Sequence, residues 1–267
     1  MLLAEVVAVL ERAYPAALAE PWDAVGLVCG DPGAPVRRVL FAVDPVEAVA
    51  QEALDTGADL LVTHHPLYLR GTSSVAATTA KGRVVHALVR GGCALLAAHT
   101  NADSASPGVS DALAGLFGLR DVTPLAPHPS VAGTGLGRVG DLPGPVALGD
   151  LVERAAAVLP ATSWGVRAAG DPDQVVRRLA VCGGAGDSLL GAAAAAGADA
   201  YLTSDLRHHA AGEAPEGLAL LDAAHWATEW PWLPVAAAAL TAGTGLEAHV
   251  SSLVTDPFCL SSRSSHA

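Results

Sequence analysis

The sequence predicts an α/β protein made of two related halves, each built on a strand–helix–strand (βαβ) unit. The segment "VRRVLFAVDPVEAVAQEALDTGADLLVTHHPLY", which begins at Val36, is repeated as "VRRLAVCGGAGDSLLGAAAAAGADAYLTSDLRHH" from Val176 onward. A constant offset of 140 residues places the Gly-Ala-Asp triplet at 57–59 on the triplet at 197–199. Each copy has the pattern of a buried strand, a loop, an alanine-rich helix and a second apolar strand. Because βαβ units form parallel strands with right-handed crossovers, the repeat favours an α/β protein of two halves.

Composition and charge exclude several classes of protein. The 267 residues suffice for one large domain or two small ones, and 51% apolar residues suffice for a packed core. A net charge of −12 argues against a nucleic-acid partner, since phosphate binding needs a basic face. The N-terminal segment lacks the basic leader of a secretory signal, and no apolar run approaches the roughly 18 residues of a membrane span. The four cysteines form no CxxC pair, so we expect a soluble cytoplasmic protein without disulfides or a membrane partner.

The other elements follow in chain order. The sequence predicts a helix over residues 2–13, then a turn and short strand in "EPWDAVGLVCG". After the first βαβ unit, "RVVHALVRGG" predicts a helix, "CALLAAHTNAD" a third strand and "GVSDALAGLFGL" another helix. The segment "APHPSVAGTGLGRVGDLPGP" is rich in glycine and proline, so we expect an irregular connection into the second half.

This organisation predicts four segments of chain. They are a first half at 1–126, a second half at 127–222, a C-terminal segment at 223–258 that returns to the functional site, and a disordered tail at 259–267. Gly135, Gly137 and Gly140 also match the dinucleotide fingerprint GxGxxG. That fingerprint needs a helix directly after it, whereas "DLPGP" follows here, so we reject a nucleotide loop.

The stretch "DLLVTHHPLYLRG" places two histidines where a buried strand ends. Adjacent strand residues point to opposite faces, so His64 and His65 can reach one cluster only where the chain turns, which Pro66 favours. In open α/β sheets, ligands gather beyond the carboxyl ends of the strands. The second copy of the repeat has Ser204 and Asp205 at this position, so the histidines are better candidates for chemistry than for scaffold. The alternative interpretation is one hydrogen-bonded core histidine and one exposed histidine.

Two further stretches carry metal-ligand side chains. In "AAHTNAD", His99, Asn101 and Asp103 occupy every second position and share a face while the strand lasts; the alternative is a turn with a cap for the next helix. In "LLDAAHWATEWP", His225 and Glu229 are spaced i, i+4, which puts both on one face of a helical turn. Pro231 requires that this helix either starts near residue 227 or stops before the proline. The alternative interpretation of this pair is a surface ion pair.

Six stretches in order resemble those of one protein family: "EPWDAVGL", "GADLLVTHHPLY", "AHTNAD", "GLGRVGDLP", "YLTSDLRHH" and "DAAHWATEWP". The chain is similar, from about residue 2 to residue 258, to the dinuclear metal-centre proteins known as GTP cyclohydrolase I type 2 homologues, the Nif-three-like family. The resemblance implies two divalent metal ions per chain in the cleft between the halves. It implies as ligands His64, His65, Asp103, His225 and Glu229. Imidazole and carboxylate ligands suit zinc, iron, manganese or nickel without distinguishing among them.

The resemblance also implies a homohexamer without the inserted domain of longer relatives. The leading hypothesis for function is a metal-dependent hydrolase that uses a metal-bridging hydroxide on a small-molecule substrate, with GTP ring opening as the activity that the family name suggests. His99, His208 and His209 are the candidates for acid and base catalysis or for orienting the ligands. The alternatives are a non-catalytic metal-binding hexamer that acts as a scaffold or interaction protein, and a protein with a single structural metal.

Overall fold

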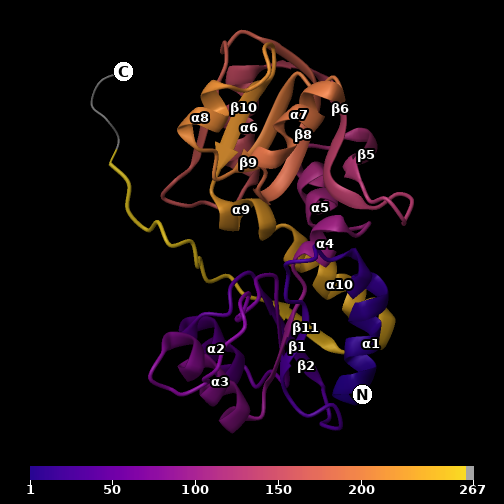
Figure 1. Cartoon of the computed structure of the whole chain (residues 1–267), viewed down its shortest axis with the longest axis vertical. Helices are drawn as coiled ribbons and strands as arrows, with labels where there is room; N and C mark the ends of the chain where they lie inside the picture. Colours follow the sequence, from indigo (N-terminus) through magenta and orange to yellow (C-terminus); the bar gives the residue numbers. More distant parts are fainter. Residues whose placement is uncertain (263–267) are drawn as a thin grey trace. The chain divides into compact units, whose positions relative to one another are not determined.

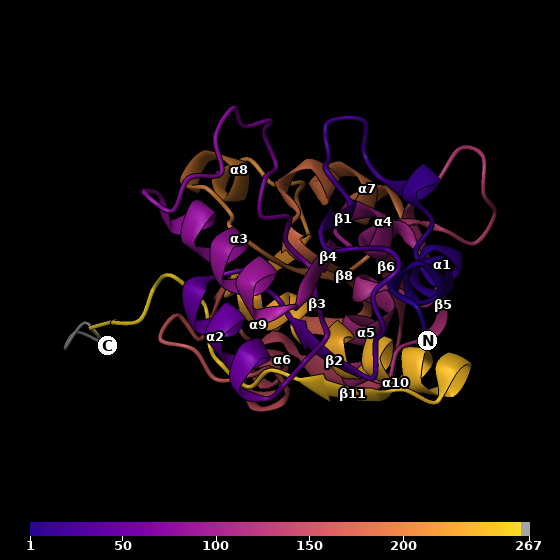
Figure 2. The same ribbon diagram turned by 90° about the horizontal axis from the view of Figure 1, so that it is seen from below.

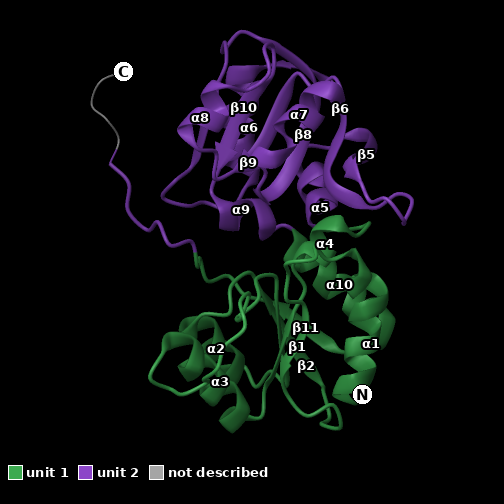
Figure 3. Cartoon of the chain, viewed as in Figure 1, with its two compact units in different colours: residues 1–108, 232–255 green, residues 109–231, 256–267 purple. Residues whose placement is uncertain are grey.

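The computed structural model describes residues 1–262, which fall into two compact units (Figure 3). Of the described residues, unit 1 comprises 1–108 and 232–255, and unit 2 comprises 109–231 and 256–262. The units therefore part at Gly108, whereas the ranges 1–126, 127–222 and 223–258 follow the sequence repeat. Residues 259–262 of the predicted tail have no regular secondary structure, and residues 263–267 lie outside the described residues.

Unit 1 contains a five-stranded sheet between two pairs of helices (Figures 1 and 2). Its strands lie in the order β1-β4-β3-β2-β11, and all are parallel except β1 at the edge. Helices α2 and α3 cover one face, and α1 and α10 cover the other. The elements are α1 (Leu3–Ala13), η1 (Ala16–Leu18), β1 (Gly26–Cys29), β2 (Arg38–Ala42), α2 (Glu47–Asp55), β3 (Leu60–Thr63), α3 (Ala80–Gly91), β4 (Ala94–Ala97), α4 (Thr100–Ser104), α10 (Trp232–Thr244) and β11 (Glu247–Val250).

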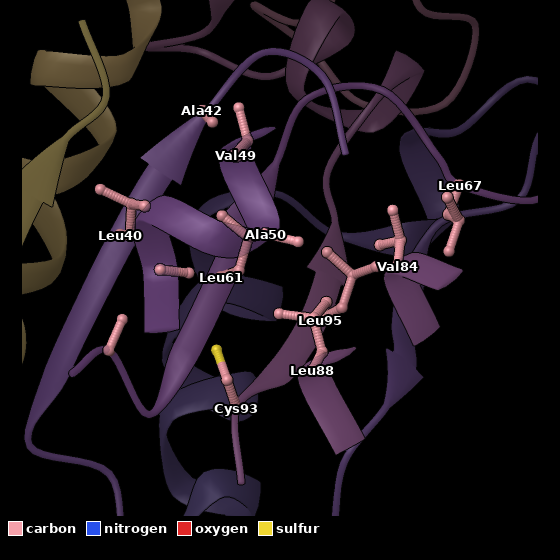
Figure 4. Close-up of a cluster of buried hydrophobic side chains, with 12 residues drawn as sticks. Leu40, Ala42, Val49, Ala50, Leu61, Leu67, Val84, Leu88, Cys93 and Leu95 are labelled. Carbon is pink, nitrogen blue, oxygen red and sulfur yellow. The ribbon is translucent and has the colours of Figure 1, made fainter. Parts of the chain in front are cut away.

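The core of unit 1 explains why its inner strands β3 and β4 are almost entirely apolar. Every residue of β3 and β4 is buried, because helices cover both faces of the sheet. On the α2–α3 side, Leu40, Leu61 and Leu95 of three neighbouring strands pack against the buried faces of the two helices (Figure 4). Packing against these helices therefore holds the carboxyl ends of the three strands in fixed positions.

Unit 2 contains a six-stranded mixed sheet in the order β5-β6-β8-β9-β10-β7. Strands β8, β9 and β10 are parallel, and β5, β6 and β7 pair antiparallel with their neighbours. The elements are α5 (Val109–Leu116), β5 (Arg120–Pro127), β6 (Gly135–Ala147), α6 (Leu148–Val158), β7 (Val166–Ala169), β8 (Val175–Ala185), η2 (Asp187–Leu189), α7 (Leu190–Ala195), β9 (Ala200–Ser204), α8 (His208–Gly212), β10 (Ala219–Ala223) and α9 (His225–Glu229). Among residues 1–262, no helix is long and apolar enough to cross a membrane.

Both predicted βαβ units form, as β2-α2-β3 and β8-α7-β9, each with parallel strands. In both units, the shared Gly-Ala-Asp triplet follows the helix, and its aspartate ties the start of the second strand to the start of the first. Asp59 accepts hydrogen bonds from the backbone N–H groups of Arg37 (2.7 Å) and Arg38 (3.0 Å). Asp199 accepts the equivalent pair at 2.7 and 2.9 Å. What the two copies share is thus scaffold, as predicted.

The prediction of an irregular glycine- and proline-rich connection is wrong for most of its length. Residues 135–145 of this segment lie in β6, which pairs antiparallel with β5, and only residues 128–134 form an irregular connection. A Cβ on Gly135 would lie 2.2 Å from the carbonyl oxygen of Ala126, and one on Gly140 would lie 2.6 Å from that of Arg120. The glycines therefore permit close approach of the two strands, and Gly137 has a positive φ of 62°. They lie within a strand, not at the turn from a strand into a helix.

Candidate metal-binding site

Three histidines of unit 1 meet beyond the carboxyl ends of two neighbouring strands. His64 and His65 follow β3, and His99 follows the last residue of β4 by two positions. The ring centroids are 5.1 Å apart for His64 and His65, 5.2 Å for His64 and His99, and 5.5 Å for His65 and His99. One ligand nitrogen from each ring lies within 4.8 Å of the other two. The three imidazoles can therefore serve one metal centre.

The ring orientations of His64 and His65 are fixed by hydrogen bonds at Nδ1. His64 Nδ1 lies 3.0 Å from the carbonyl oxygen of Ala98, and His65 Nδ1 lies 2.7 Å from Oδ1 of Asp44. Because a carbonyl or a carboxylate only accepts, Nδ1 carries the proton and Nε2 is the nitrogen that can bind a metal. His64 is fully buried, with the ring of buried Trp232 5.6 Å away.

His99 is held in the same way by Asp23. Its Nδ1 donates to Asp23 Oδ1 at 2.8 Å, and the other carboxylate oxygen accepts from the backbone N–H of Thr100 at 3.0 Å and from its hydroxyl. Burial alone would raise the pKa of Asp23, but the hydrogen bonds from His99 and Thr100 lower it well below the ordinary value. Asp23 is therefore a carboxylate at neutral pH and fixes the proton of His99 on Nδ1.

Asp103 approaches the cluster from a helix. The strand β4 ends at residue 97, so the prediction that His99 and Asp103 share a strand face is wrong. His99 instead precedes α4, and the i, i+4 spacing of a helical turn brings Asp103 Oδ1 to 3.7 Å from His64 Nε2. Asn101 turns away and donates from its side chain to the carbonyl oxygen of Tyr14 at 2.7 Å.

His225 and Glu229 form a second ligand pair, in unit 2. The helix α9 ends before Pro231, which is one of the two predicted positions. His225 Nε2 lies 2.8 Å from Glu229 Oε1, and its Nδ1 donates to Asp205 Oδ2 at 2.7 Å. The charge of Glu229, opposed by burial and aided by Asp205, raises the pKa of His225 to about 11. The pair therefore favours a positive charge at Nε2.

The glycine-rich end of β8 makes room for this pair. A Cβ on Gly184 would lie 2.5 Å from Glu229 Oε1 and 3.1 Å from His225 Nε2. Gly184 also has a positive φ of 68°, which side chains with a Cβ rarely adopt. Its N–H donates to Thr228 Oγ1 at 2.9 Å, which ties the strand end to α9. A glycine is thus required here by both conformation and space.

His208 and His209 lie on α8, where both are exposed and their ring centroids are 5.3 Å apart. His208 lines a cavity of about 360 Å³ in unit 2 together with Arg167 and Asp222. Within residues 1–262, neither histidine belongs to a group of side chains with the spacing of metal ligands.

Sequence reasoning missed the three carboxylates that orient the histidines. Asp44 lies two residues after the end of β2, Asp205 directly follows β9, and Asp23 precedes β1. The signal that could have identified them is a carboxylate near the end of one strand, in a chain whose histidines follow the ends of other strands. Spacing alone could not pair them, because Asp23 and His99 are separated by 76 residues in the chain.

The relatives of this chain agree on one family. The model of Duf34/NIF3 (NGG1p interacting factor 3) matches residues 1–257. A Streptomyces coelicolor protein named GTP cyclohydrolase 1 type 2 homolog is 57% identical over 265 residues, which cover 96% of this chain and 93% of the relative. A Mycobacterium tuberculosis protein of the same name is 40% identical over 368 residues, with 97% of each chain covered. That alignment is longer than this chain, so the relative carries additional sequence.

Solved structures show the same fold. A Bacillus cereus protein related to NIF3 superposes with a TM-score of 0.89 at 26% identity and covers 98% of this chain and 99% of its own. Reduced HcgD from Methanocaldococcus jannaschii has a TM-score of 0.77 at 30% identity, with 95% and 98% covered. With the family model matching nearly the whole sequence, the chain belongs to the Duf34/NIF3 family.

Proposed function

We propose that this chain binds two divalent metal ions and acts as a metal-dependent hydrolase. The proposed ligands are those that the family resemblance implies: His64, His65, Asp103, His225 and Glu229. The observation that carries the proposal is the state of the imidazoles. Each of the three ligand histidines has an acceptor at Nδ1, at 2.7–3.0 Å, and this arrangement is typical of metal-binding histidines.

The donor set fits a divalent metal. It combines neutral imidazoles with carboxylates, and backing carboxylates such as Asp44 and Asp205 increase the basicity of the ring they hold. At His225, the charge of Glu229 favours a cation strongly enough to keep the ring protonated, and a metal ion would supply that positive charge instead. Zinc, iron, manganese and nickel all accept such ligands.

Bound divalent ions would supply the hydrolytic chemistry, because they lower the pKa of water and stabilise charge on reacting oxygens. The chain itself supplies proton transfer. His99 lies among the ligand histidines, and Asp23 holds the proton on its Nδ1, so Nε2 can take up or release a proton. His208 and His209 are the other two acid–base candidates in this proposal. The name of the relatives, GTP cyclohydrolase 1 type 2 homolog, supports a hydrolytic reaction on a small molecule.

Metal content tests the proposal. We expect two equivalents of metal per chain in untagged wild-type protein and one or none in His65→Ala. The control is His86→Ala, which removes an exposed histidine from α3 and should leave the content unchanged. Less than one equivalent in the wild type, unaltered by His65→Ala, would overturn the metal centre.

Activity tests the hydrolase. Protein treated with a chelator should lose hydrolysis of phosphoester, nucleotide or amide substrates and regain it when metal is returned. A chain that binds two metals and hydrolyses none of these classes would instead be a non-catalytic metal-binding protein.

A further inference from the structure

A cavity of about 550 Å³ opens beside His65 in unit 1. Its wall begins at the carboxyl ends of β2 and β3, with Asp44 and His65, and continues over the first residues of α2 and α3. This volume lies within the range of about 300–1,000 Å³ that is typical of small-molecule sites. A molecule bound here would lie against a proposed metal ligand.

The cavity contains the only lysine of the chain. Of the 15 lysine and arginine residues in the sequence, only Lys81 is a lysine. The Lys81 ammonium lies 5.8 Å from the centroid of the Tyr68 ring, and in the described part of the chain it forms no ion pair. Its charge is therefore available to a ligand.

The two carboxylates that line the cavity already have partners. Asp44 accepts from His65 Nδ1 at 2.7 Å and from the hydroxyl of Thr255. Glu47 accepts two hydrogen bonds from Arg83, at 2.9 and 2.7 Å. Lys81 is thus the charged group of the wall that lacks an opposite charge.

The remaining wall sets the chemistry of the ligand. Pro45, Val46, Pro66 and Leu67 give an apolar surface that suits a flat or apolar body. The helices α2 and α3 both begin at the cavity, and their positive N-terminal ends add to the field of Lys81. A lysine ammonium, as a compact point charge, suits a phosphate group.

We propose that this cavity binds a small phosphorylated molecule, with its phosphate at Lys81 and its apolar or flat body against the proline and leucine wall. The inference rests on the proposed function in that it names the class of substrate for the centre at His65. The binding of the phosphate itself requires no metal. Metal content and phosphate binding can therefore be tested separately.

The single lysine gives a site-specific probe. Reductive methylation of the full-length chain with ¹³C-formaldehyde labels two amines, Lys81 and the N-terminus of Met1. We expect titration with phenylphosphonate, which resists hydrolysis, to shift the Lys81 methyl resonance to saturation and to leave that of Met1 in place. Benzyl alcohol should shift neither. An unchanged Lys81 resonance at saturating phenylphosphonate would overturn the proposal.

Variants give the affinity. By calorimetry, Lys81→Gln should bind phenylphosphonate about tenfold or more weakly, since it loses a charge-assisted hydrogen bond. Lys81→Arg should bind within a few fold of the wild type, and Arg90→Gln, which removes an exposed cation from the far end of the same helix, should not change binding. Equal affinity in Lys81→Gln, or benzoate bound as tightly as phenylphosphonate, would contradict a phosphate site at Lys81.

The same titration after chelator treatment separates the two proposals. If the chain contains no metal in any preparation but still binds phenylphosphonate through Lys81, the phosphate site is supported and the metal-dependent hydrolase is overturned. Two metals per chain without Lys81-dependent binding would give the opposite result.

Discussion

At the scale of single residues, the candidate site depends on carboxylates that are not proposed as ligands themselves. Each of them holds one ring nitrogen of a proposed ligand histidine. Asp44 holds Nδ1 of His65 at 2.7 Å and thereby fixes both the proton and the plane of the ring. Asp205 does the same for His225. Such partners tune affinity without touching the metal.

We predict that Asp44→Asn lowers metal affinity about 10–100-fold while the protein remains folded. The amide keeps the shape of the carboxylate but loses the charge that strengthens His65 as a ligand. Competition with a chromophoric chelator measures the change. Asp55→Asn, an exposed position on the same helix–strand unit, is the matched control. Equal metal affinity in Asp44→Asn and the wild type would show that Asp44 does not support a ligand.

Gly184 gives a second prediction at this scale. Alanine there would place a Cβ 2.5 Å from Glu229 Oε1 on a backbone with φ of 68°. We expect Gly184→Ala to lose stability by about 1–2 kcal/mol or more from the left-handed backbone alone and to lose metal by displacing the His225–Glu229 pair. Thermal unfolding and metal content measure the two effects.

Gly191→Ala is the control for this substitution. Gly191 lies on α7, where an added Cβ would meet nothing within 4 Å, so alanine should be neutral or stabilising. If Gly184→Ala behaved like Gly191→Ala in both measurements, the close packing around Glu229 would not matter for the site.

At the scale of elements, the repeat was readable because its signals are local. An apolar strand, a helix and a Gly-Ala-Asp triplet each follow from adjacent residues, and both βαβ units formed as predicted. The strands β5 and β6 were missed because their glycines serve contacts between strands, which local propensity does not show. The position of Asp103 was misassigned because β4 ends two residues before His99, and strand ends depend on pairing with neighbours.

The matching aspartates of the two βαβ units give a prediction for these elements. Asp59→Ala removes the acceptor for two backbone N–H groups at the start of β2, so amide exchange at Arg37 and Arg38 should accelerate by about tenfold or more. Asp199→Ala should have the same effect at Arg177 and Arg178. Hydrogen exchange with mass spectrometry resolves the two strands. Acceleration at both strands in either single variant would mean global destabilisation and would contradict a local role.

At the scale of the whole molecule, sequence and structure divide the chain differently. The repeat suggests consecutive halves, whereas unit 1 is completed by residues 232–255, which return after unit 2 to supply α10 and the edge strand β11. The proposed ligands come from both units, with His64, His65 and Asp103 in one and His225 and Glu229 in the other. Spacing in the sequence cannot assign residues to such units, because the contacts that define them join distant segments. The family resemblance supplied the complete ligand set that the isolated motifs did not.

The expected homohexamer is a further prediction at this scale. Six chains of 26.7 kDa have a mass of about 160 kDa, which light scattering can measure. Exposed apolar side chains such as Trp22 and Phe258, at 59% and 62% exposure, are candidates for burial between chains. Each chain carries a net charge of −12, so assembled chains repel one another and added salt screens this repulsion. We therefore expect the hexamer to dominate at physiological ionic strength and to dissociate more readily as salt is removed. A monomer at every salt concentration would contradict the hexamer, and a hexamer that dissociates as salt is added would show that ion pairs between chains outweigh the net charge.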